Sequence, residues 1–127
     1  MTIRKLQFFL KPDFSEDGTN TRKFEGEMYS VFVHYLREAA SGRRGNVTLN
    51  KILQFTTGED EEPVLGFKIP PSLVFVDADD GHFLPTANTC INRLKLPVAT
   101  MTHPKSLTEV LHNLYDYAFS NSYFGLV

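Results

Sequence analysis

The chain contains one cysteine, Cys90, which ends the pentapeptide TANTC at residues 86–90. A cysteine thiolate is a nucleophile and a metal ligand, so this side chain could form a covalent intermediate. Free cysteine is also among the most buried residue types, and a packing role is the alternative interpretation. The preceding run, FLPTANT, is polar and is constrained by Pro85, which favours a side chain held on an ordered loop. Local context leaves both interpretations open.

Four histidines could act with this thiol: His34, His82, His103 and His112. A cysteine hydrolase needs one of them brought to the thiol by the fold, with an acid or amide to orient it. His34 and His112 fall in helical segments, where surface or hydrogen-bonded positions are expected. No partner follows His82 or His103 at a recognisable spacing. One cysteine and four scattered histidines also lack the ligand-pair spacing of a metal site, so neither a metal nor an organic cofactor is expected.

The residues after Cys90, INRLKLP, alternate enough to predict a strand, which places the thiol where a loop enters a sheet. If the strand phase begins at Cys90, its side chain shares a face with Leu94 and Leu96. Arg93 and Lys95 then point to the other face. They are therefore poor candidates for direct activation of the thiolate.

Two helices are predicted in the first half of the chain. The first has one apolar face in the i, i+3, i+4, i+7, i+8 pattern, begins at Met28 and stops before Gly42. The second begins with Thr48 as its N-cap and ends at Gly58, which can adopt the left-handed conformation of many helix ends. The apolar positions of the two helices are Met28, Val31, Phe32, Tyr35 and Leu36, and then Leu49, Ile52 and Leu53. Residues 1–25 are predicted to be a peripheral N-terminal arm.

The second half of the chain begins with the acidic run GEDEEP, residues 58–63, which is predicted to be a solvated loop or a partner-facing charge patch. SLVFVD, residues 72–77, is predicted to be a strand. Asp80 and Gly81 then form a dipeptide typical of tight hairpin turns, so the chain is expected to reverse and return through His82 and Phe83.

The last predicted element is an amphipathic helix with a capping box formed by Ser106 and Glu109. Its apolar stripe is Leu107, Val110, Leu111, Leu114, Ala118 and Phe119. Together the elements predict a mixed α/β (α+β) domain, with helices packed on a small sheet.

Composition limits the classes of protein that fit. With 127 residues and 42% hydrophobic content, the chain can bury one core and form one domain. The net charge of -2 gives no electrostatic reason to expect nucleic acid or an anionic membrane as a partner. No apolar run approaches the roughly 20 residues that span a bilayer, and no signal peptide is expected. We therefore expect a monomer in the cytoplasm or the nucleus.

The run LPTANTCINRLKLP, residues 84–97, resembles the catalytic segment of HECT-type ubiquitin ligases, where Leu-Pro precedes Thr-Cys, Asn, Leu-x-Leu and Pro. ILQFTTG, residues 52–58, is similar to the Leu-x-Phe-x-Thr-Gly helix end of the family's catalytic C-terminal lobe, the C-lobe. Gly66-Phe67 resembles the Gly-Phe that follows there, and Phe124 matches a phenylalanine near the family's C-terminus. The resemblance covers residues 28–127, and it implies a C-lobe-like domain at residues 26–127 with a small central sheet of about four strands.

The sequence also departs from the family pattern. Many members have histidine where this chain has Asn88, and phenylalanine where it has Ile91. Asn88 cannot titrate near neutral pH, so any acid-base role of that histidine has no equivalent here. The family's N-lobe, which recruits the ubiquitin-conjugating enzyme, could correspond at most to residues 1–25, as a remnant of its edge or hinge. The residues Ala-Asn-Thr-Cys that end at Cys90 most resemble the branch similar to the G2/M-phase-specific ubiquitin ligase.

The resemblance implies a transferase in which Cys90 carries ubiquitin as a thioester. Leu84 and Pro85 would shape the loop, and Phe124 would support transfer to lysine. The thiol and the ubiquitin tail would be oriented by three polar residues, Thr86, Asn88 and Thr89, for which ordinary loop hydrogen bonding is the alternative. The implied partners are ubiquitin, a conjugating enzyme and a protein substrate. A C-lobe that kept the fold but lost turnover, and only binds ubiquitin or a partner, is the second hypothesis.

Overall fold

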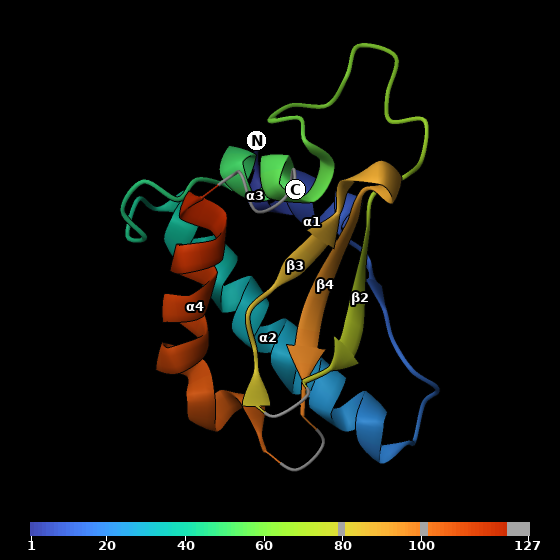
Figure 1. Ribbon diagram of the computed structural model, residues 1–127, viewed down its shortest axis with the longest axis vertical. Coiled ribbons are helices and arrows are strands. Elements are labelled where there is room, and N and C mark those ends of the chain that lie inside the picture. Colours follow the sequence, from blue (N-terminus) through green and yellow to red (C-terminus); the bar gives the residue numbers. More distant parts are fainter. Residues whose placement is uncertain (79–80, 100–101, 122–127) are drawn as a thin grey trace.

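A central sheet and the helices packed on it organise the chain (Figure 1). The computed structural model describes residues 1–78, 81–99 and 102–121. In chain order the elements are α1 (Ile3–Phe9), β1 (Pro12–Asp13), α2 (Asn20–Ala40), α3 (Leu49–Thr57), β2 (Ser72–Asp77), β3 (Thr86–Asn88), the 3-10 turn η2 (Thr89–Ile91), β4 (Arg93–Val98), the 3-10 turn η3 (Pro104–Leu107) and α4 (Thr108–Ser120). The predicted mixed α/β class is confirmed. None of the described helices is long and apolar enough to cross a bilayer.

The described strands form one sheet in the order β1-β2-β4-β3. β2 lies between β1 and β4 and runs parallel to both, while β3 pairs antiparallel with β4. The hairpin predicted after β2 is therefore wrong, because parallel neighbours occupy both edges of β2. The chain instead returns to pair with β4, and Asp80 of the expected turn lies outside the described residues.

Aromatic rings fill the space between the helices. The Tyr35 and Tyr115 rings pack edge to face at 5.3 Å between centroids, and Phe55 and Phe119 do so at 5.1 Å. Such pairs add about 0.5–1.5 kcal/mol beyond the burial of their area. They join α2, α3 and α4, and the sheet adds the buried side chains Leu73, Leu94 and Leu96. The core thus holds together the helices that pack against the sheet, including its end that carries Cys90.

The sequence analysis predicted a peripheral arm at residues 1–25, and this prediction is wrong. Leu6 and Leu10 are fully buried in the core. Helix α2 begins at Asn20, well before the predicted Met28, because Thr19 caps it by accepting a hydrogen bond from the N–H of Arg22 at 3.1 Å. Whether residues 1–25 correspond to the edge of an N-lobe stays a prediction.

Helix α3 agrees with the sequence at both ends. The Thr48 hydroxyl accepts a hydrogen bond from the N–H of Lys51 at 3.2 Å, and Gly58 ends the helix with a φ of 83°. A side chain at this left-handed position would add strain, which explains the glycine. Helix α3 packs against both β3 and η2, so it supports the segment that carries Cys90.

The capping box predicted for the last helix is wrong. Ser106 lies in the 3-10 turn that Pro104 starts, and its hydroxyl donates to the carbonyl of His103 at 2.7 Å. Because this turn continues directly into α4, Ser106 is not at the helix end and caps no N–H. Val110 is 52% exposed, since the buried face follows Leu111, Tyr115, Ala118 and Phe119 instead.

Removal of the α3 cap should weaken the support under the sheet. We expect Thr48→Ala to lower the free energy of unfolding by about 1 kcal/mol, because the N–H of Lys51 loses its acceptor. Thr48→Ser keeps the hydroxyl and should remain close to wild type. Guanidinium unfolding of the three proteins measures this, and equal midpoints for alanine and serine would contradict it.

Candidate functional site

Cys90 is exposed and lies on η2, the 3-10 turn that connects β3 to β4. The sequence had predicted that the strand phase starts at Cys90, but the strand begins at Arg93. The reason is Asn92, which adopts a left-handed conformation with a φ of 54° and so ends the turn before the strand starts. The thiol is therefore presented by a turn and is not part of the sheet.

Hydrogen bonds hold the backbone of this turn from both sides. The side-chain oxygen of Asn88 accepts from the N–H of Cys90 at 3.2 Å. The amide of Asn92 donates to the carbonyl of Ile69 at 2.7 Å, and its own carbonyl accepts from the N–H of Ser72 at 3.0 Å. The turn is thus fixed to β3 on one side and to the start of β2 on the other.

The residues predicted to surround the thiol have different environments. Pro85 is buried, and Leu84 is half-buried against the core. Thr86 and Asn88 are exposed on β3, while Thr89 is half-buried on η2. The structure thus brings the five residues together in one segment before and within the Cys90 turn. Phe124 lies outside the described residues.

None of the interactions described for the histidines involves Cys90. His103 pairs with Glu27 at 2.9 Å, and His34 lies 3.8 Å from the Glu38 carboxylate. His112 is buried, and its Nε2 lies 3.1 Å from the carbonyl of Val31. His82 precedes β3, and the chain enters β3 from the end of the sheet opposite η2 (Figure 1).

This geometry provides no general base for a cysteine hydrolase among the described residues. The same part of the chain also contains no group of three or more His, Cys, Asp or Glu side chains placed to hold a metal ion. The functional chemistry that the described residues support is that of a positioned, exposed thiol.

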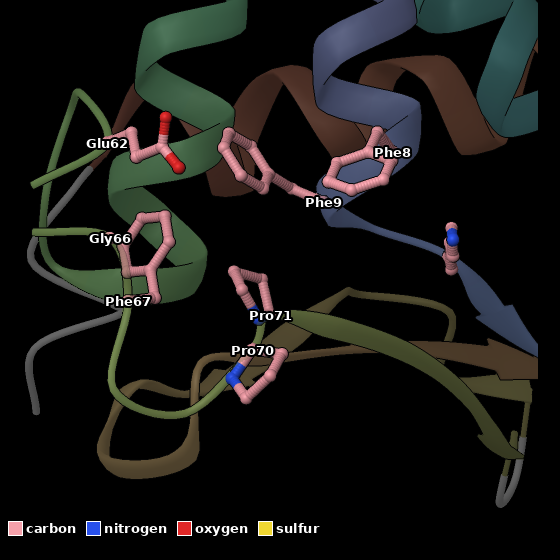
Figure 2. A pocket seen from close by; sticks show the side chains of 8 residues that line it. Phe8, Phe9, Glu62, Gly66, Phe67, Pro70 and Pro71 are labelled. Atoms are coloured by element: carbon pink, nitrogen blue, oxygen red, sulfur yellow. The ribbon is translucent and has the colours of Figure 1, made fainter.

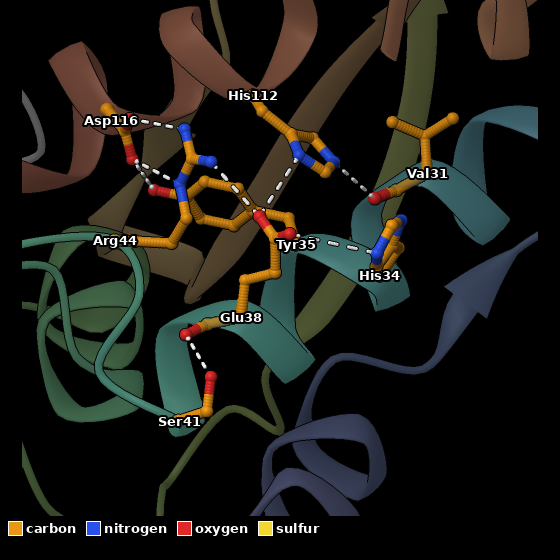
Figure 3. A network of polar contacts seen from close by, with 8 residues as sticks. All are labelled: Val31, His34, Tyr35, Glu38, Ser41, Arg44, His112 and Asp116. Carbon is orange, nitrogen blue, oxygen red and sulfur yellow. Dashed lines mark hydrogen bonds and ion pairs between the residues drawn. The ribbon is translucent and has the colours of Figure 1, made fainter. Parts of the chain in front are cut away.

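A polar network between α2, α4 and the loop that follows α2 was not anticipated from the sequence (Figure 3). The Arg44 guanidinium donates to both Asp116 oxygens and, at 3.0 Å, to Glu38. The Tyr35 hydroxyl donates to Asp116 at 2.8 Å. Burial and the Asp116 carboxylate both raise the pKa of Tyr35, while hydrogen bonding to Asp116 raises the pKa of Arg44. The network joins α2 and α4 to the loop at residues 41–47, which leads into the Thr48 cap.

His112 lies on the same network with a different electrostatic balance. Burial lowers its pKa, although the Val31 carbonyl and the Glu38 carboxylate favour its charged form. Its Nδ1 lies 3.6 Å from Glu38. Because Arg44 and Asp116 are 72 residues apart, no local pattern could have revealed this cluster.

Loss of the Asn88 side chain should loosen the Cys90 turn. We expect Asn88→Ala to speed hydrogen exchange of the Cys90 amide about fivefold, since one hydrogen bond of about 1 kcal/mol is lost. Asn88→Asp keeps an acceptor oxygen and should leave exchange close to wild type. Amide exchange followed by NMR measures both variants, and unchanged exchange in Asn88→Ala would show that the hydrogen bond does not hold the turn.

Comparison with known proteins identifies the class of this chain. The family model described as HECT-domain (ubiquitin-transferase) matches residues 16–123. The match covers most of the chain, so the chain belongs to the HECT-domain family.

Individual ubiquitin ligases match shorter segments of the chain. A probable E3 ubiquitin protein ligase, C167.07c of Schizosaccharomyces pombe, is 44% identical over 48 residues, which are 36% of this chain and 5% of the relative. E3 ubiquitin-protein ligase pub1 of the same organism is 41% identical over 61 residues, 43% of this chain and 8% of the relative. The human apoptosis-resistant E3 ubiquitin protein ligase 1 is 46% identical over 50 residues, 39% of this chain and 6% of the relative. The matched part is thus a small fraction of each relative's length.

Proposed function

We propose that this chain accepts ubiquitin as a thioester on Cys90 from a ubiquitin-conjugating enzyme and passes it to a substrate lysine. The observation that carries the proposal is the exposed thiol on a turn fixed at both ends, by Asn88 and by Asn92. Membership of the HECT-domain family and the ubiquitin ligase names of the relatives support the same activity.

In the first step, the Cys90 thiolate would attack the thioester carbonyl that joins ubiquitin to the conjugating enzyme. A new carbon–sulfur bond forms at Cys90, the old one breaks, and the conjugating enzyme leaves as its own thiolate. One thioester replaces another, so the step is nearly balanced in energy. Positioning of the thiol then matters more than strong chemical activation. This fits a site whose described histidines interact elsewhere.

In the second step, the neutral amine of a substrate lysine would attack the Cys90 thioester. An amide bond forms, the carbon–sulfur bond breaks, and the Cys90 sulfur leaves with the electron pair. The amine loses a proton to solvent, and the thiol is restored. The amide is more stable than the thioester, so this step drives the transfer forward.

The neighbouring residues have proposed roles in these steps. Pro85 is buried and Leu84 lies against the core, so both would fix the approach to the turn. Asn88 would hold the Cys90 backbone through its side-chain oxygen. Thr86 and Thr89, together with Asn88, would contact the ubiquitin tail, and Phe124 would support transfer to lysine by analogy with the family. The G2/M-phase-specific branch, a cytoplasmic or nuclear location and a monomeric state are further parts of the proposal.

A ubiquitin- or partner-binding domain without turnover is the second candidate. It is favoured by Asn88, which is occupied as a hydrogen-bond acceptor and cannot exchange protons near neutral pH. This candidate predicts that ubiquitin binding is indifferent to Cys90→Ala.

Discharge to lysine separates the two candidates. The chain would be loaded with a small-molecule ubiquitin thioester, freed of excess reagent and mixed with free lysine. The proposal predicts that ubiquitin–lysine amide appears as the loaded chain disappears, in proportion to lysine concentration. Loading followed only by hydrolysis at a lysine-independent rate would contradict the transferase. An unloaded chain that still binds ubiquitin would support the second candidate.

A further inference from the structure

An open apolar pocket of about 420 Å³ lies between α1 and the loop that joins α3 to β2 (Figure 2). Its walls are mainly aromatic and proline side chains: Phe8, Phe9, Phe67, Pro70 and Pro71. The Phe9 and Phe67 rings pack edge to face at 5.4 Å between centroids. Phe8 remains 63% exposed at the mouth. The pocket can therefore receive one bulky apolar side chain from outside.

The loop beside this pocket carries two more exposed apolar side chains. Val64 and Leu65 lie fully in solvent at the tip of a turn. The N–H of Gly66 closes that turn on the carbonyl of Pro63 at 2.8 Å, and Gly66 has a φ of 79°. Adjacent large apolar side chains on an ordered turn next to an apolar pocket mark a contact surface for another molecule.

Two charged side chains, Glu62 and Lys11, are among those that line the pocket, and Glu62 ends the acidic run at residues 59–62 on the adjoining loop, here called the acidic rim. Residues 59–62 are four consecutive carboxylates, and all four residues are exposed. Within the described part of the chain, Glu62 forms an ion pair with Lys5 at 3.4 Å, and no ion pair involves the side chains of Glu59, Asp60 and Glu61. Such a rim attracts a cationic partner and repels an anionic one.

The pocket is physically tied to the Cys90 turn. Ile69 precedes Pro70 and Pro71 of the pocket wall, and its carbonyl accepts the 2.7 Å hydrogen bond from the Asn92 amide. Ser72, which follows the wall, donates its N–H to the Asn92 carbonyl. Both the loop and η2 lie at the same end of the sheet (Figure 1). A chain seated in the pocket would therefore lie at the end of the sheet that carries the thiol.

We infer that this pocket and its acidic rim dock the acceptor: a basic substrate segment that places an aromatic or large aliphatic side chain in the pocket and a nearby lysine at Cys90. The inference rests on the proposed function, because it names the class of substrate for that same thiol. Lysine is cationic until it reacts, and basic neighbours raise the attraction to the rim.

NMR titration of the uniformly labelled protein tests the inference without any transfer reaction. The probe is the peptide acetyl-Gly-Lys-Arg-Lys-Phe-Gly-amide. Its two matched controls replace the three basic residues with glutamate, or the phenylalanine with alanine. The probe should shift the amide signals of Phe8, Leu65 and Phe67, and each control should bind at least about tenfold more weakly. Equal binding of probe and controls, or shifts only elsewhere, would overturn the inference.

Charge reversal on the rim gives the matched variant. The double substitution Asp60→Lys and Glu61→Lys should weaken probe binding at least about tenfold. The control, Glu16→Lys and Asp17→Lys, makes the same change of net charge at exposed positions on another loop and should bind like wild type. If both double variants lose binding equally, peptide binding depends only on the net charge of the protein, and the inference fails. If free ubiquitin shifts the same signals and the probe does not, the surface is a ubiquitin site and the inference also fails.

The two proposals can fail separately. Peptide docking uses no covalent step, so Cys90→Ala should bind the probe like wild type. Docking without ubiquitin loading would reject the transferase, and with it the acceptor role, while leaving a basic-peptide site. Loading without docking would reject the acceptor site alone.

Discussion

Replacement of Cys90 by alanine should abolish ubiquitin transfer, with formation of ubiquitin–lysine amide falling to the level seen without protein. Within the described part of the chain, the histidines and the polar network have their interactions away from the Cys90 turn, so they offer no substitute nucleophile. The variant should lose transfer because the nucleophile is missing, while its fold is retained. Because the side chain is exposed, the free energy of unfolding should change by less than about 0.5 kcal/mol.

The measurement follows ubiquitin–lysine formation by gel and mass spectrometry for wild type and Cys90→Ala, with unfolding curves recorded in parallel. Ile91→Ala is a neighbouring control that trims the same turn but retains the thiol, so it should keep transfer. Transfer by Cys90→Ala at the wild-type rate would show that the thiol takes no part. Loss of transfer together with loss of fold would instead give Cys90 a structural role.

Replacement of Asp116 by alanine should produce the largest loss of stability among the polar changes. The free energy of unfolding should fall by about 3 kcal/mol, because the fully buried Tyr35 loses the acceptor of its hydroxyl and Arg44 loses its bidentate carboxylate. Glu38 alone would then hold the guanidinium. The loop at residues 41–47 should loosen first, since Arg44 is its link to α4.

Asp116→Asn is the matched control for this effect. It retains an oxygen that can accept from Tyr35 but removes the charge that faces Arg44, so roughly half of the loss should remain. Guanidinium unfolding of wild type, alanine and asparagine variants gives the three values. A loss below about 1 kcal/mol for alanine would mean that the network behaves as an ordinary surface ion pair.

The parts of the fold that depend on neighbouring residues were predictable from the sequence. Helix α3 is one example, because its N-cap Thr48 and its terminal Gly58 act within one turn of the helix. The strand at residues 72–77 is another, since its apolar, β-branched composition sets it locally. The packed face of α2 also follows the predicted spacing, although the helix starts earlier.

Long-range choices were not predictable in the same way. A turn dipeptide after β2 indicated a hairpin, yet strands distant in sequence occupy both edges of β2. Ser106 fitted a capping box, but the 3-10 turn from Pro104 displaces the helix start. The N-terminal segment was predicted to be a peripheral arm, whereas α1 buries Leu6 and forms one wall of the apolar pocket.

The candidate site likewise has parts that could be predicted from neighbouring residues and parts that depend on long-range contacts. Cys90 and its flanking residues were predicted as the site from one contiguous run, and the structure places Cys90 on the turn η2, directly after the strand that carries Thr86 and Asn88. The hydrogen bond from Asn92 to Ile69 joins residues 23 apart and could not be foreseen. Nor could the position of the loop between α3 and β2 at the same end of the sheet as η2.

The most direct test of the central claim is the intact mass of the protein after reaction with a small-molecule ubiquitin thioester. The account predicts one added ubiquitin, located at Cys90 by peptide mapping and released by a thiol reductant. A HECT C-lobe of known activity, treated in parallel, shows that the reagent is competent. If that control is loaded while this chain gains no ubiquitin, or gains it at a lysine and not at Cys90, the proposed transfer through Cys90 is contradicted.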